Sequence, residues 1–274
     1  MNPLEKSLKA RLNNYALANG IAPQVALQDY MFQRFLIRLS RSRHKEHFLL
    51  KGGLLVANLV GWHYRSTLDM DVTLRHFPLS ATTLRRAWEE IVAVPMDDGV
   101  RFAWVSSTPS RPDDPYGGLS IRFDATYGSI RVALSMDVTA GDAVAGSREY
   151  EIPGILEPES AFSLYGYSVE TILAEKVETI LRRGLLNTRT KDFYDVLALT
   201  RMHPVDRRDF LSALNATAEH RGTQSLLRSP ATIIDNLERD RVMLARWQRY
   251  SAQYPYAANI TFADCLSALR ALLA

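Results

Sequence analysis

The sequence predicts an α+β fold, in which a mixed sheet with flanking helices is followed by a helical part. Apolar residues recur with period two in the middle of the chain and with helical spacing on both sides of it. The length of 274 residues, 47% of them apolar, suits one large or two ordinary domains. We expect a first domain over residues 1–150, which includes N-terminal helices, and a helical domain over residues 151–274.

The individual elements follow from these periodicities. Helices are expected over residues 3–17 and 23–42, and strict alternation indicates half-buried strands over 69–75, 119–124 and 130–139, with 102–105 as a further candidate. Residues 146–158, GSREYEIPGILEP, are expected to connect the two domains, because they contain Pro153, Gly154 and Pro158. The predicted helices of the second domain cover residues 168–183, 190–201, 206–219, 230–249 and 260–273.

Cysteine and hydropathy patterns restrict the class of protein. The single cysteine, Cys265, excludes an intramolecular disulfide framework and a multi-cysteine zinc site. No stretch approaches the ~18 consecutive apolar residues of a membrane span, and the N-terminus is charged where a signal peptide is apolar. We therefore expect a cytoplasmic protein without a membrane partner.

Positive charge is concentrated near the start of the chain. The net charge is only +3, but residues 1–50 contain eight Lys and Arg against three acids. Such a cluster can attract a polyanion such as RNA, since neutralised phosphates release counterions. A solvated helix face explains the same charges equally simply.

Residues 51–53 lie between two apolar segments. An apolar lead-in at 48–50 reaches Lys51, Gly52 and Gly53, and an apolar helical run follows over 54–60. Two glycines at this place let the backbone approach a ligand and direct free N–H groups at an anion. An ordinary tight turn is the alternative, and the GxxxxGK[ST] spacing of a Walker loop is absent.

Three aspartates indicate a metal centre. Asp69 and Asp71 are two apart in a predicted strand, so both carboxylates project from one face. Carboxylate pairs suit Mg²⁺, whose coordination is completed by water and substrate phosphates. Asp137, on the polar face of the predicted strand 130–139, would reach the same metal if the two strands pair, with Asp124 as a competitor. Solvated strands are the alternative explanation.

Two predicted C-terminal helices each carry a charged residue near their apolar face. Lys176 flanks the apolar stripe of residues 168–183, and Asp192 lies on the apolar face of the next helix, where it needs a partner. Lys176 is the natural candidate, and Asp195 is a weaker one than Asp192. The alternatives are a lysine whose stem packs on its helix and a carboxylate that complements a helix dipole. On the first helix, three side chains are expected to point away from the stripe: Glu175, Glu178 and Arg182.

These motifs together resemble a known family. The order K-G-G, apolar helix, R-S-T and D-M-D resembles the nucleotidyltransferase signature of the DNA polymerase beta superfamily. More narrowly, it is similar to the AbiEii/AbiGii toxin family, which includes the MenT-type toxins of type IV-like toxin–antitoxin systems. The segments 174–176 (AEK) and 189–195 (RTKDFYD) match the remaining motifs of that family. The resemblance covers residues 48 to 200 and implies a polymerase beta-like nucleotidyltransferase core.

The resemblance also implies a reaction and its partners. The chain would be the toxin that transfers NMP from an NTP to an RNA acceptor, the tRNA 3′ end, and so blocks translation until a cognate antitoxin restrains it. One or two Mg²⁺ would bind Asp69, Asp71 and Asp137. The implied catalytic residues are Asp69, Asp71, Asp137, Lys176 and Asp192, and the implied nucleotide-binding residues are Lys51, Gly52, Gly53, Arg65, Thr67, Arg189 and Lys191.

Two other functions remain compatible with the sequence. One is a regulatory module that holds GTP or another nucleotide without transfer, and the other is an enzyme that transfers NMP to protein hydroxyls. Thr67 is a predicted control point, because a phosphate there would compete with the triphosphate for Lys51 and Arg65. Alternatively, the hydroxyl of Thr67 only hydrogen-bonds the turn before the strand.

Overall fold

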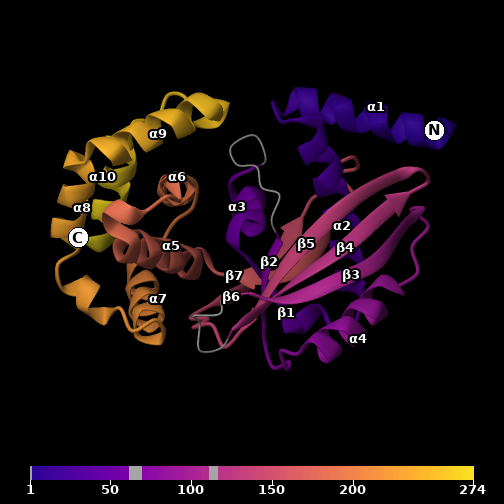
Figure 1. Ribbon diagram of the computed structural model, residues 1–274, viewed down its shortest axis with the longest axis horizontal. Helices are drawn as coiled ribbons and strands as arrows, with labels where there is room; N and C mark the ends of the chain where they lie inside the picture. The colour runs from indigo at the N-terminus through magenta and orange to yellow at the C-terminus, as the bar shows by residue number, and fades with distance from the viewer. Residues whose placement is uncertain (1, 62–69, 111–116) are drawn as a thin grey trace. The chain divides into compact units, whose positions relative to one another are not determined.

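A computed structural model describes residues 2–61, 70–110 and 117–274 of the protein. The described residues divide into two compact units. The first unit takes those within Met1–Asn58, Ser66–Gly141 and Arg148–Gly166, and the second takes those within Leu59–Arg65, Asp142–Ser147 and Tyr167–Ala274. A mixed sheet with helices and a helical C-terminal part confirm the predicted α+β class (Figure 1).

The first unit is built on a seven-stranded sheet with the order β3-β4-β5-β2-β1-β7-β6. Strand β2 lies near its centre, antiparallel to β1 and parallel to β5. Strands β3, β4 and β5 form an antiparallel meander, and β1 pairs in parallel with β7. The strands are β1 (Phe48–Lys51), β2 (Met70–Leu74), β3 (Val100–Ser110), β4 (Gly118–Tyr127), β5 (Ile130–Ala140), β6 (Ser147–Ile152) and β7 (Phe162–Tyr167).

Helices cover one face of the meander. Helix α2 (Pro23–Arg41) packs on β5 and α4 (Ala81–Val92) on β3, while α1 (Pro3–Ala18) packs on α2. Alternation directs the apolar side chains of β4 and β5 to this face, where Phe123 and Leu134 are almost completely buried. The opposite face carries polar and small side chains, and the described helices of this unit leave it open in Figure 1.

The second unit is helical, and α5 is its central helix. Helix α5 (Val169–Arg183) contacts α6, α7 and α8, and α10 packs on α6 and α8. Apolar residues of α5 and α6, such as Val177 and Phe193, are buried between the helices. The remaining helices are α6 (Thr190–Met202), α7 (Arg207–His220), α8 (Pro230–Arg239), α9 (Arg241–Gln253) and α10 (Phe262–Leu273).

The structure corrects several predicted elements. The single helix predicted over 230–249 is wrong, because Asp240 is extended and its side chain accepts a hydrogen bond from the Met243 N–H, which caps a new helix. The predicted connecting stretch contains β6, a charged strand at the sheet edge, where charge discourages pairing with other chains. Helix α4 and strand β7 were not predicted.

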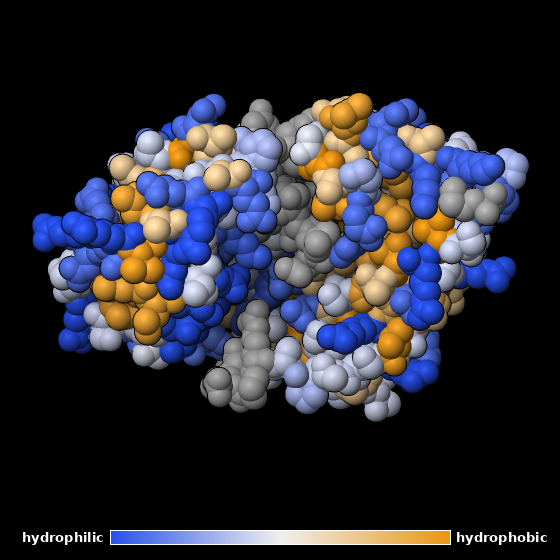
Figure 2. Space-filling view, turned by 45° about the horizontal axis from the view of Figure 1, so that its top comes forward, coloured by the Kyte–Doolittle hydropathy of each residue, from blue (hydrophilic) through white to orange (hydrophobic). Residues whose placement is uncertain are grey.

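The surface mixes polar and apolar residues. Figure 2 shows hydrophobic residues among hydrophilic ones on the face turned to the viewer. Exposed large apolar side chains of the described residues include Leu17, Leu186 and Val242. Within the same described ranges, no helix combines the length and hydropathy needed to cross a membrane.

Candidate active site

Three charged residues form one row across the centre of the sheet. Lys51 on β1 is the register partner of Asp71 on β2, and Asp71 is the register partner of Asp137 on β5. Because register partners share a face and neighbouring strands are ~4.8 Å apart, the three side chains leave the sheet side by side. Both aspartates are partly exposed, whereas Lys51 is buried. The row therefore presents two adjacent carboxylates to solvent beside a buried cation.

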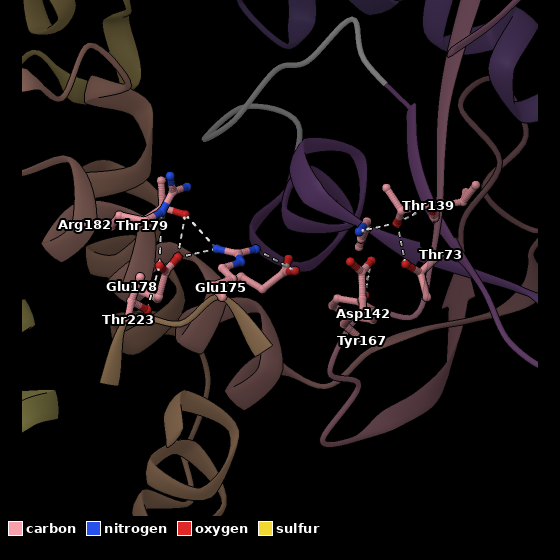
Figure 3. Close-up of polar contacts among 12 residues, drawn as sticks. Thr73, Thr139, Asp142, Tyr167, Glu175, Glu178, Thr179, Arg182 and Thr223 are labelled. Carbon is pink, nitrogen blue, oxygen red and sulfur yellow. Dashed lines mark hydrogen bonds and ion pairs between the residues drawn. The ribbon is translucent and has the colours of Figure 1, made fainter. Parts of the chain in front are cut away.

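Two threonines fix the position of Lys51. The Lys51 Nζ donates to the Thr139 Oγ1 at 2.7 Å, and the Thr139 and Thr73 hydroxyls lie 2.7 Å apart (Figure 3). Both threonines are buried. Each lies two residues after an aspartate of the row, and is therefore on the same face, ~7 Å further along the strand. A charged ammonium held there reduces the repulsion between Asp71 and Asp137. Sequence reasoning missed both threonines, although this two-residue spacing was a readable signal.

Gly52 brings the first helix turn against Asp71. Its φ of +61° is left-handed, and a Cβ atom there would lie 2.0 Å from Asp71 Oδ2. Helix α3 (Gly52–Val60) begins at this residue, so the carboxylate lies against a helix start, where backbone N–H groups and the dipole favour negative charge. Gly53 follows in the same turn. The predicted strand-to-helix turn is present, and the anionic group that approaches it in this structure is a side chain.

The second unit contains a buried ion cluster centred on Lys176. The Lys176 Nζ lies 2.9 Å from Asp192 Oδ1 and 2.6 Å from Asp195 Oδ2. The predicted contact between Lys176 and Asp192 is thus present, and Asp195, the weaker candidate, contacts the same ammonium. Both aspartates are almost completely buried. The two ion pairs hold the Lys176 ammonium in a fixed position between the helices.

Arg189 completes the charge balance of this cluster. Its Nε donates to Asp192 Oδ2 at 2.8 Å, while half of the Arg189 side chain remains exposed. Burial raises the pKa of Asp192, but the charges of Lys176 and Arg189 outweigh it and hold that pKa below its ordinary value. Lys191, in the same helix turn, is half-buried.

Another prediction for α5 is wrong. Glu178 does not point to solvent but is 1% exposed, because α7 covers it. Its carboxylate contacts Arg221, Arg182 and Thr223, and Figure 3 shows this group of side chains together. The helical wheel of α5 alone contains no information about α7, so the contacts of Glu178 with Arg221 and Thr223 could not be predicted from it.

The remaining predicted residues fall in two groups. Asp124 is on the same sheet face as Asp137, but its carboxylate binds Arg131 at 2.5 Å and its register partner on β5 is Ala133. Asp69, Arg65 and Thr67 lie outside the described residues. Within the described ranges, no group of three or more His, Cys, Asp or Glu has a metal-binding arrangement.

Comparison with known proteins identifies the family. A family model described as "Nucleotidyl transferase AbiEii toxin, Type IV TA system" matches residues 34–268. The chain belongs to the AbiEii toxin family. As an AbiEii protein it is a nucleotidyltransferase, as predicted, and the family implies an NTP substrate and a cognate antitoxin.

The solved structures similar to this AbiEii protein include two from Helicobacter pylori and one from Paracoccidioides brasiliensis. The JHP933 protein of Helicobacter pylori has a TM-score of 0.50 at 12% identity, over 92% of this chain and 91% of the other. A provisionally assigned nucleotidyltransferase from H. pylori has a TM-score of 0.49 at 14% identity, over 92% and 94%. An antigenic nucleotidyltransferase-like protein from Paracoccidioides brasiliensis has a TM-score of 0.43 at 15% identity, over 72% and 91%. No curated protein matches the chain closely enough to count as a relative.

Proposed function

We propose that this AbiEii protein transfers NMP from an NTP to an RNA acceptor, the tRNA 3′ end, in a Mg²⁺-dependent reaction that blocks translation. The observation that carries the proposal is the row in which Asp71 and Asp137 lie side by side next to Lys51. Such transfer depends on positioning and electrostatics more than on covalent chemistry, so carboxylates and cations are sufficient. The choice of tRNA rests on the family resemblance.

The donor set at the row fits Mg²⁺. Two partly exposed carboxylates on adjacent parallel strands supply oxygen ligands and leave positions for water and phosphate oxygens. Asp71 and Asp137 would hold the ion, together with Asp69. When bound, Mg²⁺ supplies positive charge that stabilises the attacking and leaving oxygens.

The residues of the row have separate tasks in the proposed reaction. The acceptor hydroxyl oxygen attacks the α-phosphorus, the new P–O bond forms, and the bond to pyrophosphate breaks. Asp137 takes the proton of that hydroxyl, since its carboxylate is exposed enough to reach solvent. The fixed charge of Lys51 and the start of α3 favour an anionic group near Asp71. We further propose that Lys176, held by Asp192, serves the same reaction.

Transfer can be tested directly with labelled nucleotides. Each of the four α-³²P NTPs is incubated with total RNA, Mg²⁺ and either the wild type, Asp69→Ala, Asp71→Ala or the matched control Asp97→Ala, which changes an exposed aspartate outside the row. We expect RNA labelling by the wild type and the control, none by the two site variants, and a similar Tm for all four proteins. Growth toxicity should follow the same order.

Other outcomes select the alternatives. Label in protein instead of RNA indicates transfer to protein hydroxyls, and NTP binding without any label indicates a regulatory module. If Asp71→Ala retains near wild-type labelling, the assignment of the row is wrong.

A further inference from the structure

The open face of the β3–β4–β5 meander leads directly to Asp137. Register partners across β3, β4 and β5 define rows on this face. The row next to Asp137 contains Arg122 of β4, flanked by serines of both neighbours. Two rows further out, Thr126 of β4 lies between Arg101 and Arg131. Since two residues of a strand span ~7 Å, Arg122 is ~7 Å and the outer arginines are ~20 Å from the row of Asp137.

Two of these arginines form no ion pair among the residues that the structure describes. Arg101 and Arg122 are exposed, and neither side chain forms a hydrogen bond or ion pair with another residue in the described ranges. Arg131 is bound to Asp124, although most of its side chain is exposed. The nearest acid on this face, Asp124, is paired with Arg131, so Arg101 and Arg122 are available to an external anion.

Small side chains keep the face flat between the arginines. Between the outer arginines and the row of Asp137, this face carries Asp124, whose carboxylate is paired with Arg131, and otherwise mainly alanine, serine and threonine: Ala103, Ser106, Thr108, Ser120, Ala133 and Ser135. Several of them are hydroxyls, which donate hydrogen bonds to phosphate and sugar oxygens. A chain of phosphodiesters can therefore approach the sheet closely.

The N-terminal basic cluster is a weaker candidate for binding a polyanion. Arg11, Arg38, Arg43 and Lys45 are each within an ion pair, with Glu157, Asp98, Glu90 and Glu149 respectively. Half of the eight basic residues counted from the sequence are thus already paired with carboxylates of the first unit. Helices α1 and α2, which carry most of the cluster, pack on the helix-covered face of the meander, opposite to the face of Asp137.

We propose that the open face of β3–β4–β5 binds the phosphodiester backbone of the single-stranded 3′ end of the acceptor RNA. Arg122 contacts the phosphate next to the attacking hydroxyl, and Arg101 contacts the backbone further from it. This inference rests on the proposed function, which supplies the RNA acceptor. It adds the surface that binds that RNA and the arginines that contact its backbone. Arg122 is a positioning residue for the 3′ end.

The test measures RNA and NTP separately. Variants Arg122→Gln, Arg101→Gln and the double variant are compared with Arg41→Gln, a matched control at an exposed arginine of the last turn of α2. A fluorescein-labelled single-stranded RNA with a free 3′-hydroxyl is titrated at several salt concentrations, and KM is determined for RNA and for NTP. Arg122→Lys keeps the charge and serves as the rescue variant.

We expect each Arg→Gln change on the face to raise the Kd and KM for RNA roughly two- to fivefold, as for an exposed ion pair. The plot of log K against log salt should become shallower by about 0.7 for each arginine. KM for NTP, the Tm and all values of Arg41→Gln should remain at wild type, and Arg122→Lys should recover most of the binding.

Four results overturn the inference: wild-type protein that does not bind RNA, Arg122→Gln that binds RNA normally, a rise in KM for NTP alone, or an equal effect of Arg41→Gln. The proposed function fails separately. If the wild type binds RNA through Arg122 but labels none, the surface stands and the transfer does not. If the wild type labels RNA and the arginine variants are unaffected, the transfer stands and the surface does not.

Discussion

Replacing Gly52 by alanine should damage the site more than the fold. The added Cβ would lie 2.0 Å from Asp71 Oδ2 and 2.7 Å from its Cγ, both far inside van der Waals contact. The Asp71 carboxylate has to move by about 1 Å or more to make room. Gly20 has the same φ of +61° with nothing within 4 Å of its added Cβ, so Gly20→Ala is the matched control.

The two variants differ by a calculable amount. Both variants should lose about 1–2 kcal/mol in free energy of unfolding, because an L-residue is strained in the left-handed region. Gly52→Ala should lose about 1–3 kcal/mol more, because its added Cβ overpacks the contact with Asp71. Moving a reacting group by ~1 Å lowers the rate about 10²-fold, so Gly52→Ala should label RNA at about 1% of wild type. Gly20→Ala should transfer normally.

Urea denaturation and RNA labelling measure these two effects on the same protein samples. A third variant, Gly52→Ala with Asp71→Ala, removes the Oδ2 and Cγ contacts and should be more stable than the sum of its two single variants predicts. The reasoning is refuted if Gly52→Ala and Gly20→Ala lose equal stability, or if Gly52→Ala transfers as fast as wild type.

Three further predictions concern single residues. Lys176→Met removes the ammonium that contacts the buried carboxylates of Asp192 and Asp195 and leaves Asp192 its ion pair with Arg189, so it should cost about 3–5 kcal/mol in urea denaturation. A double-mutant cycle of Lys176 with Asp192 on transfer rate should show ~0.5–3 kcal/mol of coupling, and additive rates would show that the two residues act independently. Thr67→Glu should lose NTP affinity at an unchanged Tm while Thr67→Ser keeps it, and a Thr67→Glu variant that binds NTP normally would contradict the control point. Burial raises the pKa of Asp29, whose carboxylate has no hydrogen-bond partner in the described residues. The free energy of unfolding should therefore fall as the pH rises from 3.8, the ordinary pKa, towards the raised pKa of the folded state. Asp29→Asn should remove this pH dependence, and an unchanged pH dependence would assign it to other groups.

Local patterns were sufficient for much of the architecture. The alternation of residues 130–139 predicted β5 with Asp137 on its polar face, because a half-buried strand imposes period two on its own sequence. The contact of Lys176 with Asp192 could be predicted for a similar reason: each residue lies near an apolar face where it needs a partner. The face of a helix or strand on which a residue lies can thus be predicted from the periodicity of that segment alone.

Non-local contacts were not readable in this way. The burial of Glu178 depends on α7, and the role of Thr139 depends on β1 reaching across β2 to β5. Strand β7, which pairs in parallel with β1 far upstream in the chain, was also not predicted. Asp195 was ranked below Asp192 from one helical wheel, while its burial follows from the packing of several helices. These features arise from tertiary contacts, which no single segment encodes.

The parallel pairing of β2 with β5 has a consequence for the order of synthesis. Lys51, Asp71 and Asp137 come from three strands, and the last of them emerges from the ribosome only after the β3–β4 hairpin has been made. Chains fold from the N-terminus as they are translated, and parallel pairings between distant segments form slowly. A nascent chain without β5 lacks a carboxylate of the row. The complete row of Lys51, Asp71 and Asp137 can therefore form only after β5 has left the ribosome.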